Sequence, residues 1–195
     1  MSYFTQKMKV SNKYSNIDRF KFFAELCKGK NVLHIGFVDW PITNRNQNMH
    51  LQIDKVAKDL VGIDPNISAF DEYKSLLVHQ EMYSGYEAVR GRHFELVIVP
   101  EVIEHVGNVQ EFLSDIDGLT FDSLYITAPD AMLLKNNFSY NPLKEDYTET
   151  VHPDHNCWYT PYTLKNTVQK YTNLSVNDLY YLGESSIMAV VRNEK

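Results

Sequence analysis

The chain has 195 residues, 44% of them hydrophobic and 23% charged, which is typical of an ordinary globular protein and excludes intrinsic disorder and fibrous structure. Its net charge of −6 argues against non-specific nucleic-acid binding through phosphate contacts. Cys27 and Cys157 form no CxxC pair, so we expect two reduced thiols. The sequence shows no signal-peptide pattern and no apolar run long enough for a membrane span, and we therefore predict a cytoplasmic protein without a membrane partner.

Short apolar runs alternate with amphipathic stretches in the first half of the chain. Helical spacing of apolar residues predicts helices over residues 17–27 and 49–59. Buried strands are predicted over residues 31–35 and 60–63, and the run Leu76-Leu77-Val78 is a weaker strand candidate. This alternation is the main indication of the fold.

The same alternation continues over residues 94–128. An apolar run predicts a strand over residues 94–99, and Asn108 is expected to cap a helix with Val109, Phe112, Leu113 and Ile116 on its inner face. Residues 124–128 form the next predicted strand, which ends at a proline.

The C-terminal part of the chain has a different pattern. Thr160-Pro161 predicts the start of a helix, because a capping residue is followed by a first-turn proline. Two β-like runs, 175–182 and 186–192, then follow with no helix between them, and we expect an antiparallel hairpin that closes one edge of the sheet.

These elements predict an α/β fold: one Rossmann-like, doubly wound sheet, mostly parallel, with an antiparallel C-terminal hairpin strand. We expect a single domain over residues 1–195. Residues 130–158 are polar and aromatic without a clear period, and long irregular segments are usually functional or mobile. We predict that this insert and the N-terminal arm, residues 1–16, form a lid on the acceptor side.

Ligands of open parallel sheets bind beyond the carboxyl ends of the strands. Gly36 ends the first predicted strand, and a glycine there allows close approach of a ligand to the backbone. Asp64 ends the second, where a carboxylate can accept hydrogen bonds from both ribose hydroxyls. The two together favour a nucleoside ligand, although each is also an ordinary turn residue.

Residues 94–106, FELVIVPEVIEHV, resemble the fourth-strand motif of class I S-adenosylmethionine-dependent methyltransferases, and the spelling EVIEHV is typical of their small-molecule branch. Asn31–Gly36 and Val61–Asp64 resemble that family's first motif and ribose acid. Tyr125–Pro129 resembles its fifth strand, and residues 155–164 resemble the segment before its last helix. The resemblance extends over most of the chain.

The resemblance implies S-adenosylmethionine as cofactor, S-adenosylhomocysteine as product and a small-molecule acceptor, with a hydroxyl oxygen as the expected methylated atom. Sugar, polysaccharide and natural-product pathways are the implied setting, and a monomer or homodimer is expected. The implied cofactor-binding residues are His34, Gly36, Asp39, Asp64, Pro65, Gln80, Glu81, Met82, Pro100 and Glu101. Within this set Gly36 faces the methionine part, Asp64 the ribose, and residues 80–82 the adenine.

The first motif departs from the family pattern. His34 stands where an acidic residue is usual, and Phe37 and Val38 stand where further glycines are usual. Asp39 could compensate for the missing acid. The departure supports one alternative, a non-catalytic binding or partner subunit with the same fold. A second alternative, another nucleotide-dependent Rossmann enzyme, is disfavoured because residues 36–41 lack the G-x-G-x-x-G spacing.

Histidines are the candidate catalytic residues, because imidazole is well suited to remove a hydroxyl proton near neutral pH. His105, after the fourth strand, is the first candidate base, and His152 and His155 are the next. Some relatives with this motif hold a divalent metal at the positions of Glu101, Glu104 and His105. That spacing is also one face of a helix start, and residues 152–155 offer no third ligand, so we predict no metal site.

Overall fold

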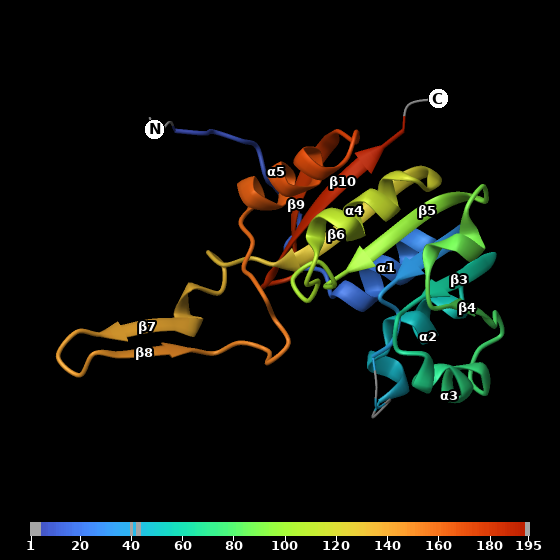
Figure 1. Ribbon diagram of the computed structural model, residues 1–195, viewed down its shortest axis with the longest axis horizontal. Helices are drawn as coiled ribbons and strands as arrows, with labels where there is room; N and C mark the ends of the chain where they lie inside the picture. Colours follow the sequence, from blue (N-terminus) through green and yellow to red (C-terminus); the bar gives the residue numbers. More distant parts are fainter. Residues whose placement is uncertain (1–4, 40, 42–43, 194–195) are drawn as a thin grey trace.

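An eight-stranded sheet forms the centre of the computed structural model, which describes residues 5–39, 41 and 44–193 (Figure 1). The strand order is β1-β9-β10-β6-β5-β2-β3-β4. The strands are β1 (Ser11–Tyr14), β2 (Asn31–Ile35), β3 (Asp59–Ile63), β4 (Glu81–Tyr83), β5 (His93–Pro100), β6 (Thr120–Pro129), β9 (Val176–Leu182) and β10 (Ser186–Arg192). Strands β2 to β6 are parallel to one another, and β10 pairs antiparallel with β6 and β9. The predicted fold class is confirmed.

Helices cover both faces of this sheet, as a doubly wound fold requires (Figure 1). Helices α4 (Val109–Asp117) and α5 (Pro161–Tyr171) pack on one face. Helices α1 (Arg19–Cys27) and α2 (Met49–Asp54) pack on the other. The short α3 (Phe70–Lys74) belongs to a third apolar cluster. None of these helices in the described part of the chain is long and apolar enough to cross a membrane.

The sheet is apolar on both sides because successive strand residues point to opposite faces. In β2, Leu33 and Ile35 join the cluster under α4 and α5, whereas Val32 joins the cluster under α1 and α2. The near-continuous apolar strand sequences therefore follow from burial on two faces.

Two predicted helix starts are confirmed in atomic detail. The Asn108 side chain accepts a hydrogen bond from the Glu111 backbone N–H at 3.2 Å and caps α4. Thr160 and Thr163 form a reciprocal capping box at the start of α5, with a proline in its first turn. Both caps satisfy backbone donors that would otherwise lack partners.

The predicted C-terminal hairpin is present as β9 and β10, but it does not form the edge of the sheet. The edge strand is β1, which pairs parallel with β9. The prediction that all of residues 1–16 form part of a lid is thus wrong for Ser11–Tyr14, while residues 1–4 lie outside the described part. Sequence analysis missed β1 because its four residues are mostly polar, as suits a half-exposed edge strand.

Two predictions on the other side of the sheet need correction. The helix expected over 49–59 ends at Asp54, and the strand expected at Leu76–Val78 is not formed. The Asp54 carboxylate accepts hydrogen bonds from the backbone N–H groups of Val78 and His79, both at 2.9 Å, which are therefore not available to a sheet. The third strand of this half is β4, Glu81–Tyr83.

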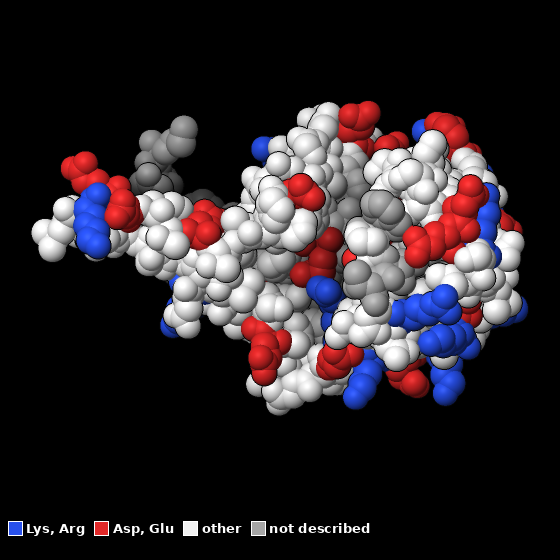
Figure 2. Space-filling model, turned by 90° about the horizontal axis from the view of Figure 1, so that it is seen from below, with Lys and Arg blue, Asp and Glu red and all other residues white. Residues whose placement is uncertain are grey.

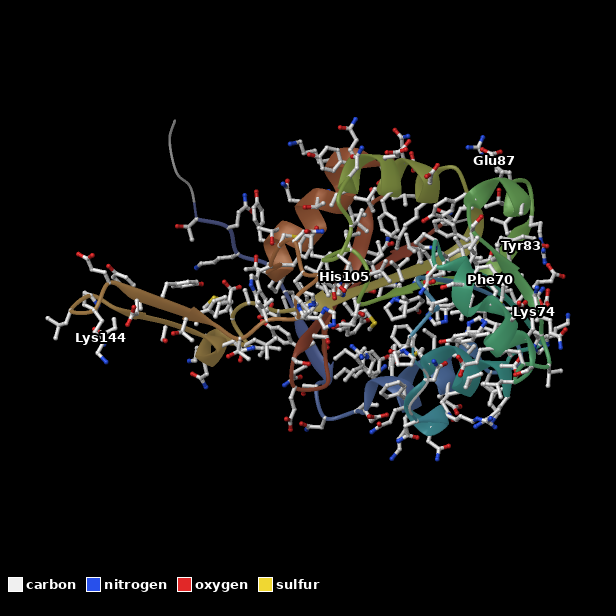
Figure 3. All side chains as sticks on the ribbon, turned by 60° about the horizontal axis from the view of Figure 1, so that its bottom comes forward. Phe70, Lys74, Tyr83, Glu87, His105 and Lys144 are labelled. Carbon is white, nitrogen blue, oxygen red and sulfur yellow. The ribbon has the colours of Figure 1, made fainter. Side chains whose placement is uncertain are left out.

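Residues 130–158 contain a regular element that the sequence did not predict. Strands β7 (Phe138–Asn141) and β8 (Asp146–Glu149) form an antiparallel hairpin that projects away from the sheet (Figure 1). Lys144, near its tip, lies far from His105 (Figure 3). The hairpin therefore does not cover the strand ends, and only the returning segment around His152–His155 reaches them.

A close backbone approach shapes the end of β2. Gly36 has a φ of 70°, in the left-handed region, and a Cβ atom there would lie 2.3 Å from Cγ2 of Val102. Gly29 has a φ of 69° but open space around it. A comparison of the two glycines therefore separates the effect of backbone strain, which both share, from the effect of steric overlap with Val102, which only Gly36 has.

We predict that Gly36→Ala lowers the free energy of unfolding by more than about 2 kcal/mol, because strain and overpacking add. Gly29→Ala is the matched control and should cost about 1 kcal/mol, from strain alone. Urea unfolding of both variants measures the difference. Equal losses in the two variants would show that Val102 moves aside freely.

Two histidines form a buried polar pair beside β2. The Nδ1 atoms of His34 and His50 lie 3.1 Å apart, and both side chains are buried. Burial lowers the pKa of His34 to about 3. Burial, with the nearby imidazoles of His34 and His79, lowers the pKa of His50 well below its usual value. Both rings are therefore neutral in the folded protein at neutral pH.

From this pair we predict that the free energy of unfolding falls in mild acid. Because the folded-state pKa values lie below the unfolded value of about 6.5, the unfolded chain takes up protons that the folded chain does not. When the pH is lowered from 7.5 to 5.5, this pair should reduce the free energy of unfolding by about 3 kcal/mol. Urea unfolding should show a smaller loss for the double variant His34→Leu/His50→Leu. An unchanged loss would assign the acid sensitivity to other groups.

Candidate functional site

A cavity of about 1000 Å³ opens at the carboxyl ends of the parallel strands. It lies where the order of the strands along the sheet switches, because β3 and β4 lie on one side of β2 and β5 lies on the other. This is the position at which open α/β sheets bind ligands. The predicted site residues that line it are His34, Gly36, Asp39, Asp64, Pro65, Pro100, Glu101, His105, His152 and His155.

Asp64 lies at the end of β3 and is 7% exposed. One carboxylate oxygen accepts a hydrogen bond from the Val38 N–H at 3.0 Å, and the other accepts one from the Asn66 N–H at 2.8 Å. Burial raises the pKa of this carboxyl, and the two backbone hydrogen bonds partly offset the rise. Each oxygen retains a lone pair, so the group can still accept two hydrogen bonds from the cavity.

Asp39 lies on the same side of the cavity, in the loop after β2. Its backbone N–H donates to the Tyr73 hydroxyl at 2.9 Å, and the Asn48 side chain donates to that same hydroxyl at 2.6 Å. Phe37 is buried against Gly62, His50 and Tyr73. The loop is thus held by polar contacts and by packing between aromatic rings.

The structure places the predicted adenine residues away from the cavity. Gln80 donates to the carbonyl of Lys74, Glu81 pairs with Arg92, and Met82 is buried in the third apolar cluster. Strand β4 continues to Tyr83, so the cavity is lined instead by Ser84 and Tyr86. The lining residues differ from the prediction because the third strand was expected at Leu76–Val78 and lies at Glu81–Tyr83.

Glu101 follows β5 in a strained conformation. Its φ is 54°, and its N–H donates to the Thr127 hydroxyl at 3.1 Å and to the Thr127 carbonyl. A non-glycine residue in this region costs about 1 kcal/mol or more, which tertiary contacts must offset. The Glu101 carboxylate pairs with the guanidinium of Arg19 at 3.1 Å. In Figure 2 acidic and basic side chains adjoin in the hollow at the middle of the face.

Glu104 is the most unusual buried group of the cavity. It is 1% exposed, and neither carboxylate oxygen has a hydrogen-bond partner within the described residues. Burial, with the Glu101 carboxylate, raises its pKa to about 8. A buried carboxyl without partners is costly, and strongly perturbed groups of this kind concentrate at functional sites.

The three candidate catalytic histidines lie together in the lining of the cavity. The ring centroids of His105 and His155 are 4.7 Å apart, and that of His152 lies 5.4 Å from His105 and 5.6 Å from His155. Burial and the neighbouring imidazoles lower the pKa values of His105 and His155. Figure 3 shows His105 where the hairpin segment meets the body of the sheet.

Several cavity residues were not found from the sequence. Arg19 and Phe20 come from α1, which precedes the first parallel strand, and Asp154 comes from the segment beyond the hairpin. Ser84 and Tyr86 follow a strand that was misplaced. No local motif marks these residues, because their position depends on packing between distant elements.

The sequence matches no protein-family model and no curated protein. Solved structures do match the fold. One is an S-adenosylmethionine-dependent methyltransferase from Clostridium acetobutylicum, with a TM-score of 0.61, 9% identity, and coverage of 90% of this chain and 91% of that chain. Another is the N-methyltransferase NodS from Bradyrhizobium japonicum in complex with S-adenosylhomocysteine, with a TM-score of 0.56, 13% identity, and coverage of 91% and 86%.

A chain of the Pnkp1/Rnl/Hen1 RNA repair complex also matches, with a TM-score of 0.58 and 16% identity. The match covers 90% of this chain and 40% of that one, so this chain corresponds to less than half of that protein. At these identities the likeness concerns the fold. This chain has the Rossmann-like fold that S-adenosylmethionine-dependent methyltransferases share.

Proposed function

We propose that this protein is an S-adenosylmethionine-dependent methyltransferase that methylates a hydroxyl oxygen of a small-molecule acceptor, such as a sugar or natural-product intermediate. The observation that supports this most is Asp64, a buried carboxylate with free lone pairs at the end of β3, facing the cavity beside Gly36. Ribose hydroxyls are the natural donors to such a group.

The remaining cavity residues fit the other parts of the cofactor. Ser84 and Tyr86 line the β4 side, where they offer a hydroxyl and an aromatic face to adenine. The Arg19–Glu101 ion pair lies across the β2–β5 junction and offers a cation and an anion to the carboxylate and ammonium of the methionine tail. Asp39 and Glu101 provide negative charge that His34, which is neutral, does not.

The bound cofactor supplies an activated methyl group, and the protein positions the acceptor in line with it. The three histidines line the cavity together with Glu101, and His152 is exposed to solvent. A hydroxyl acceptor must lose its proton as the new bond forms, and the imidazoles of His105, His152 and His155 are the groups placed to assist this.

Calorimetric titration with S-adenosylhomocysteine tests the proposal. We expect binding with one site per chain, and no binding of NADH at the same concentrations. The departure at His34 and Phe37 favours a second candidate, a non-catalytic subunit with the methyltransferase fold. A lack of detectable binding at millimolar S-adenosylhomocysteine would reject the enzyme and favour that subunit.

We predict that Asp64→Ala weakens binding of S-adenosylhomocysteine more than tenfold, about 1.4 kcal/mol, because hydrogen bonds from ribose to a charged group are lost. Asp59→Ala, at the other end of β3, is the matched control and should bind normally. Because Asp64 also holds the Val38 N–H, Asp64→Asn is compared as a variant that keeps an acceptor oxygen. Unchanged affinity in both Asp64 variants would place the ribose elsewhere.

We predict that His105→Ala lowers the rate of methyl transfer at least tenfold but changes affinity for S-adenosylhomocysteine less than threefold, because His105 lies at the acceptor end of the cavity. Transfer of radiolabelled methyl groups to a panel of hydroxylated acceptors measures the rate. His93→Gln, an exposed histidine paired with Asp122, serves as the control. Equal losses in rate and affinity would remove His105 from the acceptor side.

A further inference from the structure

The β7–β8 hairpin has two chemically different faces. In an antiparallel pair, side chains directly opposite each other point to the same side, and successive side chains alternate between sides. The register therefore places three aromatic rings and one carboxylate on one face, which we call the aromatic face: Phe138, Tyr140, Tyr147 and Glu149. The other face carries only small polar side chains: Ser139, Asn141, Asp146 and Thr148. The hairpin is thus amphipathic, although it projects away from the sheet (Figure 1).

The aromatic face is open to solvent. Tyr140 is 62% exposed, and Tyr147, its cross-strand partner, is 59% exposed. A two-stranded hairpin is only marginally stable in water, and two exposed rings leave apolar area unburied. Contiguous exposed apolar patches mark binding surfaces. The tyrosine pair therefore indicates that the hairpin binds something.

A series of ring contacts connects the aromatic face to the cavity. The Trp158 ring packs against Phe138, with centroids 4.8 Å apart, and lies 5.9 Å from the ring of His155. His155 in turn lies 4.7 Å from His105, and both belong to the histidine cluster that lines the cavity: His105, His152 and His155. The rings therefore run from the hairpin to the candidate site. Figure 3 shows the two ends of this path, with Lys144 near the hairpin tip and His105 at the sheet.

Hydrogen bonds at the base of the hairpin fix its aromatic face relative to the site. The Trp158 indole N–H donates to the Glu149 carboxylate, so Trp158 contacts both strands of the hairpin. The Thr150 N–H donates to the carbonyl of Asn137 at 2.9 Å, and the Asn137 side chain donates to the carbonyl of Thr150 at 2.9 Å. The path of rings is therefore built into the folded chain.

The charge of this segment selects among ligands that stack on aromatic rings. Residues 135–154 contain four acidic residues and two lysines, and Figure 2 shows acidic side chains along the projecting arm. A nucleic acid also stacks on such rings, but its phosphates need a basic surface. A sugar ring has a face of C–H groups, which the negative face of an aromatic ring attracts. Its hydroxyl groups can donate to carboxylates such as Glu149.

We propose that the aromatic face binds an uncharged oligosaccharide acceptor, whose terminal sugar enters the cavity while the sugars behind it stack on Trp158 and on the tyrosine pair. The inference deepens the proposed function and rests on it for the reaction at the terminal sugar. The hydroxyl of that sugar would lie beside the histidine cluster, and the hairpin would select for the length of the chain. A single sugar reaches only the cavity and should bind more weakly.

Calorimetric titration with cellohexaose, chitohexaose and maltohexaose, each compared with its monosaccharide, tests the proposal without cofactor. We expect at least one hexasaccharide to bind with a Kd of about 1 mM or tighter, and about tenfold or more tighter than its monosaccharide. The double variant Tyr140→Ala/Tyr147→Ala should lose this dependence on chain length. The matched control is Ser139→Ala/Thr148→Ala, a cross-strand pair on the other face of the same hairpin, which should bind as the wild type does. All four side chains are exposed, so both variants are expected to fold.

Several results would overturn the proposal. They are no hexasaccharide binding up to about 10 mM, equal affinity of the wild type and the tyrosine variant, or tighter binding of single-stranded oligothymidylate than of any hexasaccharide. A dimer in light scattering that the tyrosine variant converts to monomers would also overturn it, because a second copy would then cover the aromatic face.

Binding of S-adenosylhomocysteine is measured on the same samples and should be equal in the wild type and the tyrosine variant. Failure of the wild type to bind S-adenosylhomocysteine would overturn the proposed function. Failure to bind the hexasaccharides alone would overturn only this inference.

Discussion

The parallel pairing of β2 with β3 on one side and β5 on the other positions the central groups of the candidate site. It brings Gly36, Asp64 and Glu101 to one edge of the sheet, although they are far apart along the chain. Gly36 allows the close pass to Val102 that this junction needs, and Asp64 ties the loop after β2 to the end of β3 through the Val38 N–H. A cavity at this junction follows from the topology, and its chemistry follows from the few residues that end the strands.

The electrostatics of the cavity divide it into two parts. On the β2–β3 side, the Asp64 carboxyl accepts hydrogen bonds from two backbone N–H groups and still has lone pairs to offer. The β5 side brings several titratable groups close together in a partly buried region: the Arg19–Glu101 ion pair, the histidine cluster, and Glu104, whose oxygens have no hydrogen-bond partner among the described residues. In the proposed function, the first part would hold the nucleoside and the second would face the acceptor. The Arg19 guanidinium pairs with Glu101 and also acts to lower the pKa of Glu104, but burial outweighs that effect.

Sequence analysis predicted the parts of the fold that local patterns encode. The two-sided burial of strands such as β2 gives continuous apolar runs, and the caps at Asn108 and Thr160 are local hydrogen bonds between neighbouring residues. The edge strand β1 and the third strand β4 were missed or misplaced because they are short and depend on tertiary contacts. The carboxylate of Asp54, for example, takes the backbone donors of Val78 and His79, which no local pattern reveals. The same reason explains why residues 80–82 were expected at the cavity, whereas Ser84 and Tyr86 line it. The approach of His152 and His155 to His105 involves a hydrogen bond from Asn156, 51 positions beyond His105, and spacing along the chain does not reveal it.

The central claim is that an adenosyl-bearing cofactor lies along the cavity at the β2–β5 junction. A crystal structure of the protein with S-adenosylhomocysteine tests it most directly. The account predicts the ribose hydroxyls within hydrogen-bond distance of Asp64, the adenine beside Ser84 and Tyr86, and the sulfur directed toward the histidine cluster. A ligand bound elsewhere, or one whose ribose does not contact Asp64, would contradict it.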